Sequence, residues 1–124
     1  MRLLLDTVTI IRWLEASPRL SAEAREAITE GFEVYVSAVS AVEIAAKTAI
    51  GKLHTPDDFT KQIAETSMIE LPFTIRHGLA MKDLPLHHRD PFDRMLIAQA
   101  RCEGLTIVTS DRAFAAYDVS ILPA

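Results

Sequence analysis

The sequence lacks the features that define several classes of protein. It has a single cysteine, Cys102, among 124 residues, which excludes a disulfide framework within the chain and favours a reducing, cytoplasmic setting. No apolar run approaches the length that spans a bilayer, and the N-terminal residues do not combine a basic segment, an apolar segment and a cleavage site. Repeats and low-complexity linkers are absent too. We therefore expect one soluble domain over residues 1–124.

What the chain does have is an alternation of short apolar segments with segments of helical spacing. Residues 2–5 are typical of a buried strand of a parallel sheet, and residues 7–15 of the helix that follows it. This alternation predicts an α/β fold, a three-layer α/β/α sandwich with a central, mainly parallel sheet. The other expected strands are 32–36, 68–71, 105–110 and 119–122; the other expected helices are 22–30 (capped by Ser21), one from Ser37 or Ser40 to Ile50, 56–66 (capped by Thr55), 74–81 and 91–103, with a turn or short helix at 111–117.

The stretch from Asp90 to Asp111 is expected to bring two carboxylates together. Asp90 is a good N-cap, Pro91 suits the first helical position, and Gly104 suits the left-handed position that ends a helix. The helix covers roughly 20 Å, and the strand that follows covers about the same distance in the opposite direction. Asp93, in the first turn of the helix, and Asp111, just past the strand, should therefore lie at one end of the domain.

Two further acids are expected at that same end. Asp6 follows the first strand, and Glu43 lies in the first turn or so of the helix after the second strand. The carboxyl ends of parallel strands share one edge of a sheet, which is where ligands collect in such folds. Asp6, Glu43, Asp93 and Asp111 should therefore converge on this edge.

Each of these acids also has a simpler explanation by itself. Asp6 and Asp111 suit helix N-caps, Asp93 suits the positive end of a helix dipole, and Glu43 is spaced to pair with Lys47. Together, however, four carboxylates near buried structure repel one another and require a cation. Oxygen ligands without clustered cysteine or histidine favour Mg²⁺ or Mn²⁺ over Zn²⁺.

The net charge of −4 agrees with a local excess of acid. The chain has 17 acidic and 13 basic residues, so without the four candidate ligands it carries 13 of each sign. Bound divalent cations would cancel the excess. The acidic total therefore does not exclude a nucleic-acid partner.

Four segments carry a resemblance to a known family. They are Leu3-Leu-Leu-Asp-Thr7, the run from Val36 to Leu53 that contains Glu43, the run His88-Arg-Asp-Pro-Phe-Asp-Arg-Met-Leu-Ile-Ala-Gln-Ala100, and Thr109-Ser-Asp111. These segments resemble a PIN domain, and within that family the VapC toxins of bacterial type II toxin–antitoxin systems. The resemblance spans nearly the whole chain. One mild departure is Val42, where an aromatic residue is frequent in this subgroup.

The resemblance implies the toxin component of such a system, an Mg²⁺-dependent endoribonuclease. Its catalytic residues would be Asp6, Glu43, Asp93 and Asp111, which would hold one or two Mg²⁺ or Mn²⁺ ions. It also implies an RNA substrate, a cognate VapB-type antitoxin and a homodimer, with no membrane partner. The alternative is a catalytically silent PIN-like scaffold that binds RNA or protein, and the presence of all four acids favours the enzyme.

Other candidate site residues have two interpretations each. Thr7, Thr109 and Ser110 either orient water at the metal or are ordinary cap and turn hydroxyls. The basic residues near the edge, Lys47, Arg89, Arg94 and Arg112, either hold the RNA backbone or are solvated. Asp90 is expected to be a helix cap first and a metal ligand second. His87 and His88 lack the spacing of zinc ligands, so the two histidines are expected either to contact RNA or to be exposed. The apolar side chains Ile10, Ile11, Trp13 and Leu14 are expected in the core, with part of that surface in an antitoxin groove.

Two classes of aspartyl phosphotransferase also place an acid after their first strand. The phosphatases that place an acid after their first strand need a second Asp two positions later, and here that position is Val8. Receiver domains need an acceptor after the third strand, where Leu71 and Pro72 offer none. Both classes are therefore disfavoured.

Overall fold

The computed structural model describes residues 1–31, 33–53 and 58–124. Its centre is a five-stranded sheet with the order β3-β2-β1-β4-β5, in which every pair of neighbouring strands is parallel. The strands are β1 (Arg2–Leu5), β2 (Glu33–Ser37), β3 (Ile69–Leu71), β4 (Thr106–Thr109) and β5 (Ile121–Pro123). β1 is central, so the residue that follows it lies in the middle of the carboxyl edge.

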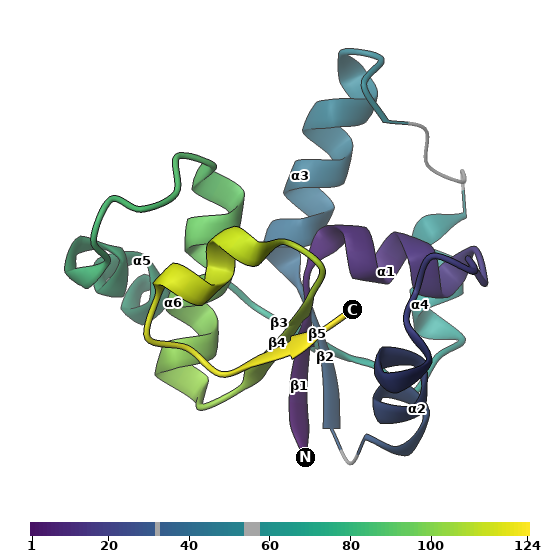
Figure 1. Ribbon diagram of the computed structural model, residues 1–124. Helices are drawn as coiled ribbons and strands as arrows, with labels where there is room; N and C mark the ends of the chain where they lie inside the picture. Colours follow the sequence, from purple (N-terminus) through teal and green to yellow (C-terminus); the bar gives the residue numbers. More distant parts are fainter. Residues whose placement is uncertain (32, 54–57) are drawn as a thin grey trace.

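Helices cover both faces of this sheet (Figure 1). One face packs against α1 (Thr7–Leu14), α2 (Ala22–Glu30) and α4 (Phe59–Ala64). The other packs against α3 (Ala38–Ala49), α5 (Ile75–Ala80) and α6 (Pro91–Glu103), with the short 3₁₀ helices η1 (Met81–Asp83) and η2 (Arg112–Ala116). The architecture is the three-layer α/β/α sandwich expected from the sequence.

The pleat of β1 divides the core into two clusters. Leu4 points into the cluster beneath α6, which also contains Leu96, whereas Leu3 and Leu5 point into the cluster beneath α1 and α2. All three leucines are fully buried. Successive side chains of a strand face opposite sides, so a run of three leucines is what a strand covered on both faces requires.

The caps of α6 are those the sequence predicted. Asp90 accepts hydrogen bonds from the backbone N–H groups of Phe92 and Asp93 through one carboxylate oxygen, Oδ1. Pro91 is the first helical residue, and Gly104 adopts a left-handed conformation with φ of +66°. These caps set where the helix begins and so place Asp93 in its first turn.

The bounds of β1 and α2 are also those expected, whereas most other boundaries differ from the expectation by one to three residues. Ser37, not Ser40, caps α3, because its hydroxyl accepts from the N–H of Val39. α5 begins one residue later than expected, since Thr74 is its N-cap, and Met81 belongs to η1. The expected start of the second strand at 32 and the helix start at 55–57 lie outside the described residues. Among the described helices, none is both long and apolar enough to cross a bilayer.

Candidate active site

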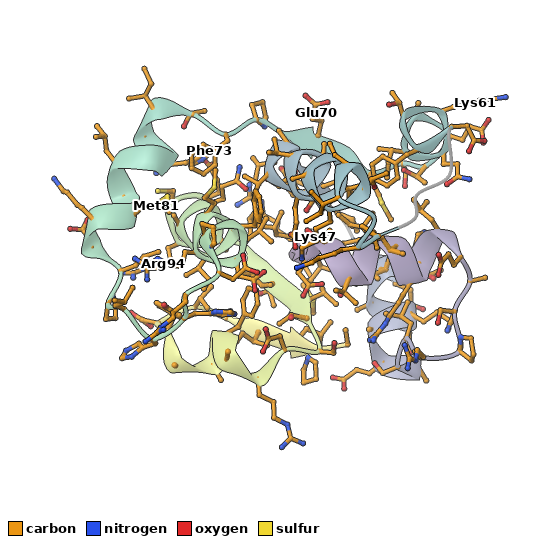
Figure 2. All side chains as sticks on the ribbon, turned by 90° about the horizontal axis from the view of Figure 1, so that it is seen from above. Lys47, Lys61, Glu70, Phe73, Met81 and Arg94 are labelled. Carbon is orange, nitrogen blue, oxygen red and sulfur yellow. The ribbon has the colours of Figure 1, made fainter. Side chains whose placement is uncertain are left out.

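The carboxyl edge of the sheet collects the acids that the sequence singled out. Asp6 directly follows β1 and caps α1, and Asp111 follows β4 and caps η2. Glu43 lies in the second turn of α3, one turn deeper than expected, and Asp93 in the first turn of α6. Figure 2 shows the molecule from above, with the side chain of Lys47 extending from α3 toward the middle of the molecule.

Asp6 is buried and held from two sides. Its Oδ1 accepts from the backbone N–H of Thr9 at 2.9 Å, and its Oδ2 accepts from the hydroxyl of Thr109 at 2.6 Å. Burial nevertheless raises the pKa of Asp6 above its ordinary value, and the charge of Glu43 adds to this rise. The two hydrogen bonds lower the pKa but oppose the rise only in part. The hydrogen bonds to Asp6 therefore do not fully compensate for the burial of its carboxylate.

Glu43 is also buried, and it contacts one hydroxyl and one cation. The hydroxyl of Thr7 donates to its Oε1 at 2.7 Å and also lies 2.9 Å from the hydroxyl of Ser40. The ammonium of Lys47, four residues along the helix, contacts Oε2 at 2.5 Å. This hydrogen bond raises the pKa of Lys47, and the nearby carboxylates of Asp90 and Asp93 raise it further.

Asp93 shows the excess of negative charge most clearly. Burial, then repulsion from Asp90 and Glu43, raise its pKa to about 7, while His88 opposes that rise. An ordinary aspartate is fully ionised at neutral pH. Near neutral pH Asp93 is therefore protonated in part of the molecules, and a cation nearby would favour its ionised form.

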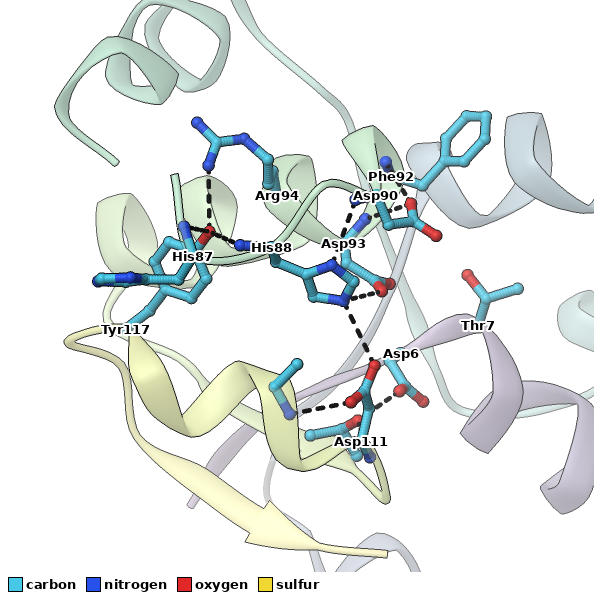
Figure 3. Close-up of polar contacts among 12 residues, drawn as sticks. Asp6, Thr7, His87, His88, Asp90, Phe92, Asp93, Arg94, Asp111 and Tyr117 are labelled. Atoms are coloured by element: carbon cyan, nitrogen blue, oxygen red, sulfur yellow. Dashed lines mark hydrogen bonds and ion pairs between the residues drawn. The ribbon is translucent and has the colours of Figure 1, made fainter. Parts of the chain in front are cut away.

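Asp111 is brought to Asp93 through a histidine. Nε2 of His88 lies 2.9 Å from Oδ2 of Asp93 and 3.4 Å from Oδ2 of Asp111, as drawn in Figure 3. One ligand-type atom from each of these three residues lies within 4.8 Å of the others. Two acids that are 18 positions apart thus meet as the sequence predicted, with a histidine between them.

The candidate hydroxyls act differently from one another. Thr109 donates to Asp6 and accepts from the N–H of Asp111, so it links two acids. Thr7 links Glu43 to Ser40. Ser110 is exposed and accepts from the guanidinium of Arg12 at 3.3 Å.

The candidate basic residues separate into three groups. Lys47 is paired with Glu43. Arg94 turns away from the carboxylates (Figure 3) and donates to the hydroxyl of Tyr117 and to backbone carbonyls of the loop at 84–85. Its role as an RNA contact is therefore disfavoured, because its donors are used inside the protein. Arg89 and Arg112 are exposed.

The two neighbouring histidines have different surroundings. His87 packs at the edge of the Tyr117 ring, with centroids 5.3 Å apart. His88 faces the carboxylates, a placement that the sequence analysis missed, as it missed Arg12 beside Ser110. The available signal was position: His88 lies two residues before the N-cap of α6, and a chain entering a helix there passes the carboxylate of the first turn.

The apolar face of α1 is mostly core, as expected. Ile10 is fully buried, and Trp13 and Leu14 are partly buried against the cluster beneath α1 and α2. A separate cavity of about 320 Å³ lies between α3 and α4, and none of the four candidate acids lines it. Its lining is largely apolar: Val36, Ala38, Ala41, Phe59, Ile63, Ala64 and Met68, with Ser37, Thr60, Thr66 and Glu70.

The donor set at the carboxyl edge fits a divalent cation. Asp6 and Glu43 are buried and Asp93 is partly buried. Among the described residues, the lysine ammonium paired with these acids is that of Lys47, which contacts Glu43. Burial, with repulsion from neighbouring carboxylates, raises the pKa of Asp6 and of Asp93. Carboxylate oxygens are the ligands that Mg²⁺ and Mn²⁺ prefer. A bound cation would relieve the repulsion that the hydrogen bonds leave.

Comparison with known proteins agrees with this architecture. The family model described as "PIN domain" matches residues 3–120. One similar solved structure is a VapBC2 complex from Rickettsia felis bound to a DNA fragment from its promoter, with a TM-score of 0.75, 14% identity, and 99% of this chain and 98% of that chain covered. FitAcB from Neisseria gonorrhoeae has a TM-score of 0.67 and 20% identity, with 97% of this chain and 96% of that chain covered. A toxin–antitoxin complex from Klebsiella pneumoniae has a TM-score of 0.65 and 16% identity, with 96% of this chain and 94% of that chain covered. No curated protein matches the sequence. The match of the family model to nearly the whole chain shows that this protein belongs to the PIN domain family.

Proposed function

We propose that this protein is the toxin component of a type II toxin–antitoxin system and cleaves RNA phosphodiester bonds with Mg²⁺ or Mn²⁺. PIN domains are typically metal-dependent nucleases. The observation that carries the proposal is the convergence of Asp6, Glu43, Asp93 and Asp111 on one edge. Burial there, together with repulsion from Asp90 and Glu43, raises the pKa of Asp93 to about 7.

The four carboxylates would be the metal ligands. Divalent ions bound there would supply a Lewis acid that stabilises the charge developing on the phosphate and the leaving oxygen. Thr109 and the N–H of Thr9 hold the carboxylate of Asp6 in one orientation, and Thr7 does the same for Glu43. Preorganised ligands reduce the cost of assembling the site when the ion arrives.

Exposed Arg89 and Arg112 and partly buried Arg12 would hold the RNA backbone beside these ligands. Arg112 directly follows Asp111, Arg89 directly precedes Asp90, and Arg12 contacts Ser110. Phosphate contacts of this kind give affinity and orientation without reading the base sequence. Single-stranded or looped RNA, whose backbone can reach a recessed carboxylate cluster, is the substrate class we favour.

A VapB-type antitoxin and a second copy of the chain are the proposed protein partners. The antitoxin is proposed from the family resemblance and from the solved toxin–antitoxin complexes that share the fold. The helix α3, its C-cap Ile50 and the helix α5 expose large apolar side chains that a partner would cover: Val42, Ile50, Ile75 and Leu79. Light scattering of the purified chain, alone and with its antitoxin, tests both assemblies.

The deciding experiment measures RNA cleavage and metal binding on the same preparations. Wild type should cleave RNA with Mn²⁺ or Mg²⁺, and EDTA should stop it. Asp93→Asn should lose at least about 100-fold in rate, because removing a ligand charge weakens the metal centre. Cys102→Ser, in the last turn of α6 and so at the opposite end of that helix from Asp93, serves as the matched control and should cleave normally.

Two outcomes would overturn the proposal. Equal cleavage by wild type and Asp93→Asn would mean that the activity comes from a contaminant or another site. RNA binding without cleavage, in the presence of either metal, would favour the silent RNA-binding scaffold instead.

A further inference from the structure

His88 is placed between two candidate ligands that come from different parts of the fold. Its Nε2 is 2.9 Å from Asp93, on α6, and 3.4 Å from Asp111, which follows β4. A histidine at such a position has two possible roles. It either binds the cation through Nε2 or donates an Nε2–H hydrogen bond to the carboxylates that bind it.

The ring is oriented by groups outside the carboxylate cluster. Its Nδ1 accepts the backbone N–H of Asp90 at 3.2 Å, and its own backbone N–H donates to the hydroxyl of Tyr117 at 2.8 Å. The ring also stands edge-on to buried Phe114, with centroids 6.1 Å apart. Contacts outside the carboxylate cluster therefore direct Nε2 at Asp93 and Asp111.

The contact at Nδ1 decides between the two roles. A neutral imidazole carries one N–H, and a nitrogen that accepts a hydrogen bond cannot also carry that proton. Since Nδ1 accepts from Asp90, the proton lies on Nε2, which then has no lone pair to offer a metal. Histidine ligands show the opposite pattern, in which the second ring nitrogen donates to a carbonyl or a carboxylate.

We propose that His88 is a positioning residue: its Nε2–H donates to Asp93 and Asp111 and holds these carboxylates together, and His88 is not itself a metal ligand. The inference rests on the proposed function only in taking the two carboxylates as ligands. His88 then links Asp93, in the first turn of α6, to Asp111, which follows β4. A donor on one oxygen of Asp93 leaves its second oxygen for the cation.

The tautomer can be measured without activity. Long-range ¹H–¹⁵N correlation spectra of the metal-free, full-length protein distinguish the two neutral forms of each histidine, and His88→Gln assigns the signal. We expect His88 to carry its proton on Nε2, and to keep it there after addition of Mg²⁺. A proton on Nδ1 in either state would overturn the proposal, as would a directly bound ¹⁴N nucleus in pulsed EPR spectra of the Mn²⁺ complex.

A substitution series gives an independent test. The amide nitrogen of glutamine takes the place of Nε2–H as a donor but is a poor metal ligand. We therefore expect His88→Ala to weaken Mn²⁺ binding about tenfold by calorimetry, and His88→Gln to restore most of that affinity. His87→Ala, at the neighbouring histidine that packs on Tyr117, is the matched control and should bind as wild type does.

Failure of the inference and failure of the proposed function are distinguishable. If His88→Gln binds Mn²⁺ as weakly as His88→Ala, His88 acts as a ligand and the inference is wrong, while the metal site stands. If wild type binds neither Mn²⁺ nor Mg²⁺, the proposed function is wrong, and the tautomer spectrum of the metal-free protein still decides the role of His88 as a donor.

Discussion

The hydroxyl of Thr109 donates a 2.6 Å hydrogen bond to Oδ2 of Asp6, and so joins the last residue of β4 to the residue after β1. The same hydroxyl oxygen accepts the backbone N–H of Asp111 at 3.0 Å. One side chain therefore orders two acids at the carboxyl edge. Because Thr109 and Asp6 are both buried, water is a poor substitute for this contact.

Replacing Thr109 by valine should destabilise the protein and weaken its metal site. Valine keeps the shape of threonine but leaves a buried carboxylate oxygen without its donor, which costs about 1–3 kcal/mol. Urea unfolding of the metal-free chain measures this loss. Thr109→Ser keeps the hydroxyl and should stay close to wild type; equal losses in the two variants would mean that the methyl group, rather than the hydrogen bond, matters.

Lys47 should be needed for stability because it neutralises buried Glu43. Lys47→Met keeps the aliphatic stem but removes the ammonium, and we expect a loss of about 1–3 kcal/mol, less than for a fully buried pair because Lys47 is partly exposed. Saturating Mg²⁺ should recover part of this loss, since a cation would take over the neutralising role.

The double variant Glu43→Gln/Lys47→Met separates charge from packing. Removing both charges together leaves no unpaired buried carboxylate, so the double variant should be more stable than Lys47→Met alone. Chemical unfolding at a fixed pH and salt concentration measures both. Additive losses would show that the ion pair does not couple the two residues.

Asp93 should make the metal-free protein less stable as pH rises. Its pKa is about 7 in the folded chain and near 4 when unfolded, so the folded state binds more protons between these values. Stability from this group is therefore full below about pH 4 and falls as pH rises toward 7. Asp93→Asn carries no titrating group and should lack this component.

Comparing wild type with Asp93→Asn isolates the contribution of Asp93 to the pH dependence of stability. The advantage of Asp93→Asn over wild type should grow by about 1–3 kcal/mol between pH 4 and pH 8, measured by urea unfolding in EDTA. Contributions from groups that the substitution leaves unchanged largely cancel in the difference. Saturating Mg²⁺ at pH 8 should reduce or reverse it, because the ionised carboxylate then has a partner. A pH-independent difference would show that burial does not raise the pKa of Asp93.

Much of this site follows from local sequence signals. Asp90, Pro91 and Gly104 specify the ends of α6 by capping chemistry alone, and the length of the helix then places Asp93. The position of Asp6 follows from three leucines that only a strand covered on both faces accommodates. Capping and periodicity depend on residues close together in the chain, so a single sequence is enough to recognise them.

The remainder depends on contacts between distant segments, for which one sequence gives no signal. His88 reaches Asp111 across 23 positions, and Tyr117 fixes the histidine loop through backbone N–H groups that any residue would present. Sequence shows the charge of Arg94 but not its partners, so it does not predict that Arg94 donates to Pro85 and Tyr117 inside the protein. The orientation of a side chain at a loop is set by packing, which the local pattern does not encode.

Arg112 and Arg89 should support RNA affinity, whereas Arg94 should support the fold. Arg112→Ala and Arg89→Ala remove exposed guanidinium groups, so each should weaken RNA binding and lower the salt dependence of the binding constant by about one unit of slope, without loss of stability. Arg94→Ala removes donors to Tyr117 and to the carbonyls of Leu84 and Pro85, and should lower the free energy of unfolding by about 1–3 kcal/mol.

Fluorescence titration of labelled RNA over a range of salt concentrations, with a metal-free buffer to prevent cleavage, separates these roles. Arg101→Ala, on the exposed surface near the end of α6, is the control and should leave both quantities unchanged. A variant of Arg94 that keeps full stability but loses the salt-dependent part of RNA binding would reverse the assignment. The guanidinium of Arg94 would then have to leave Tyr117 when RNA binds, which the loss of that hydrogen bond in the RNA complex would reveal.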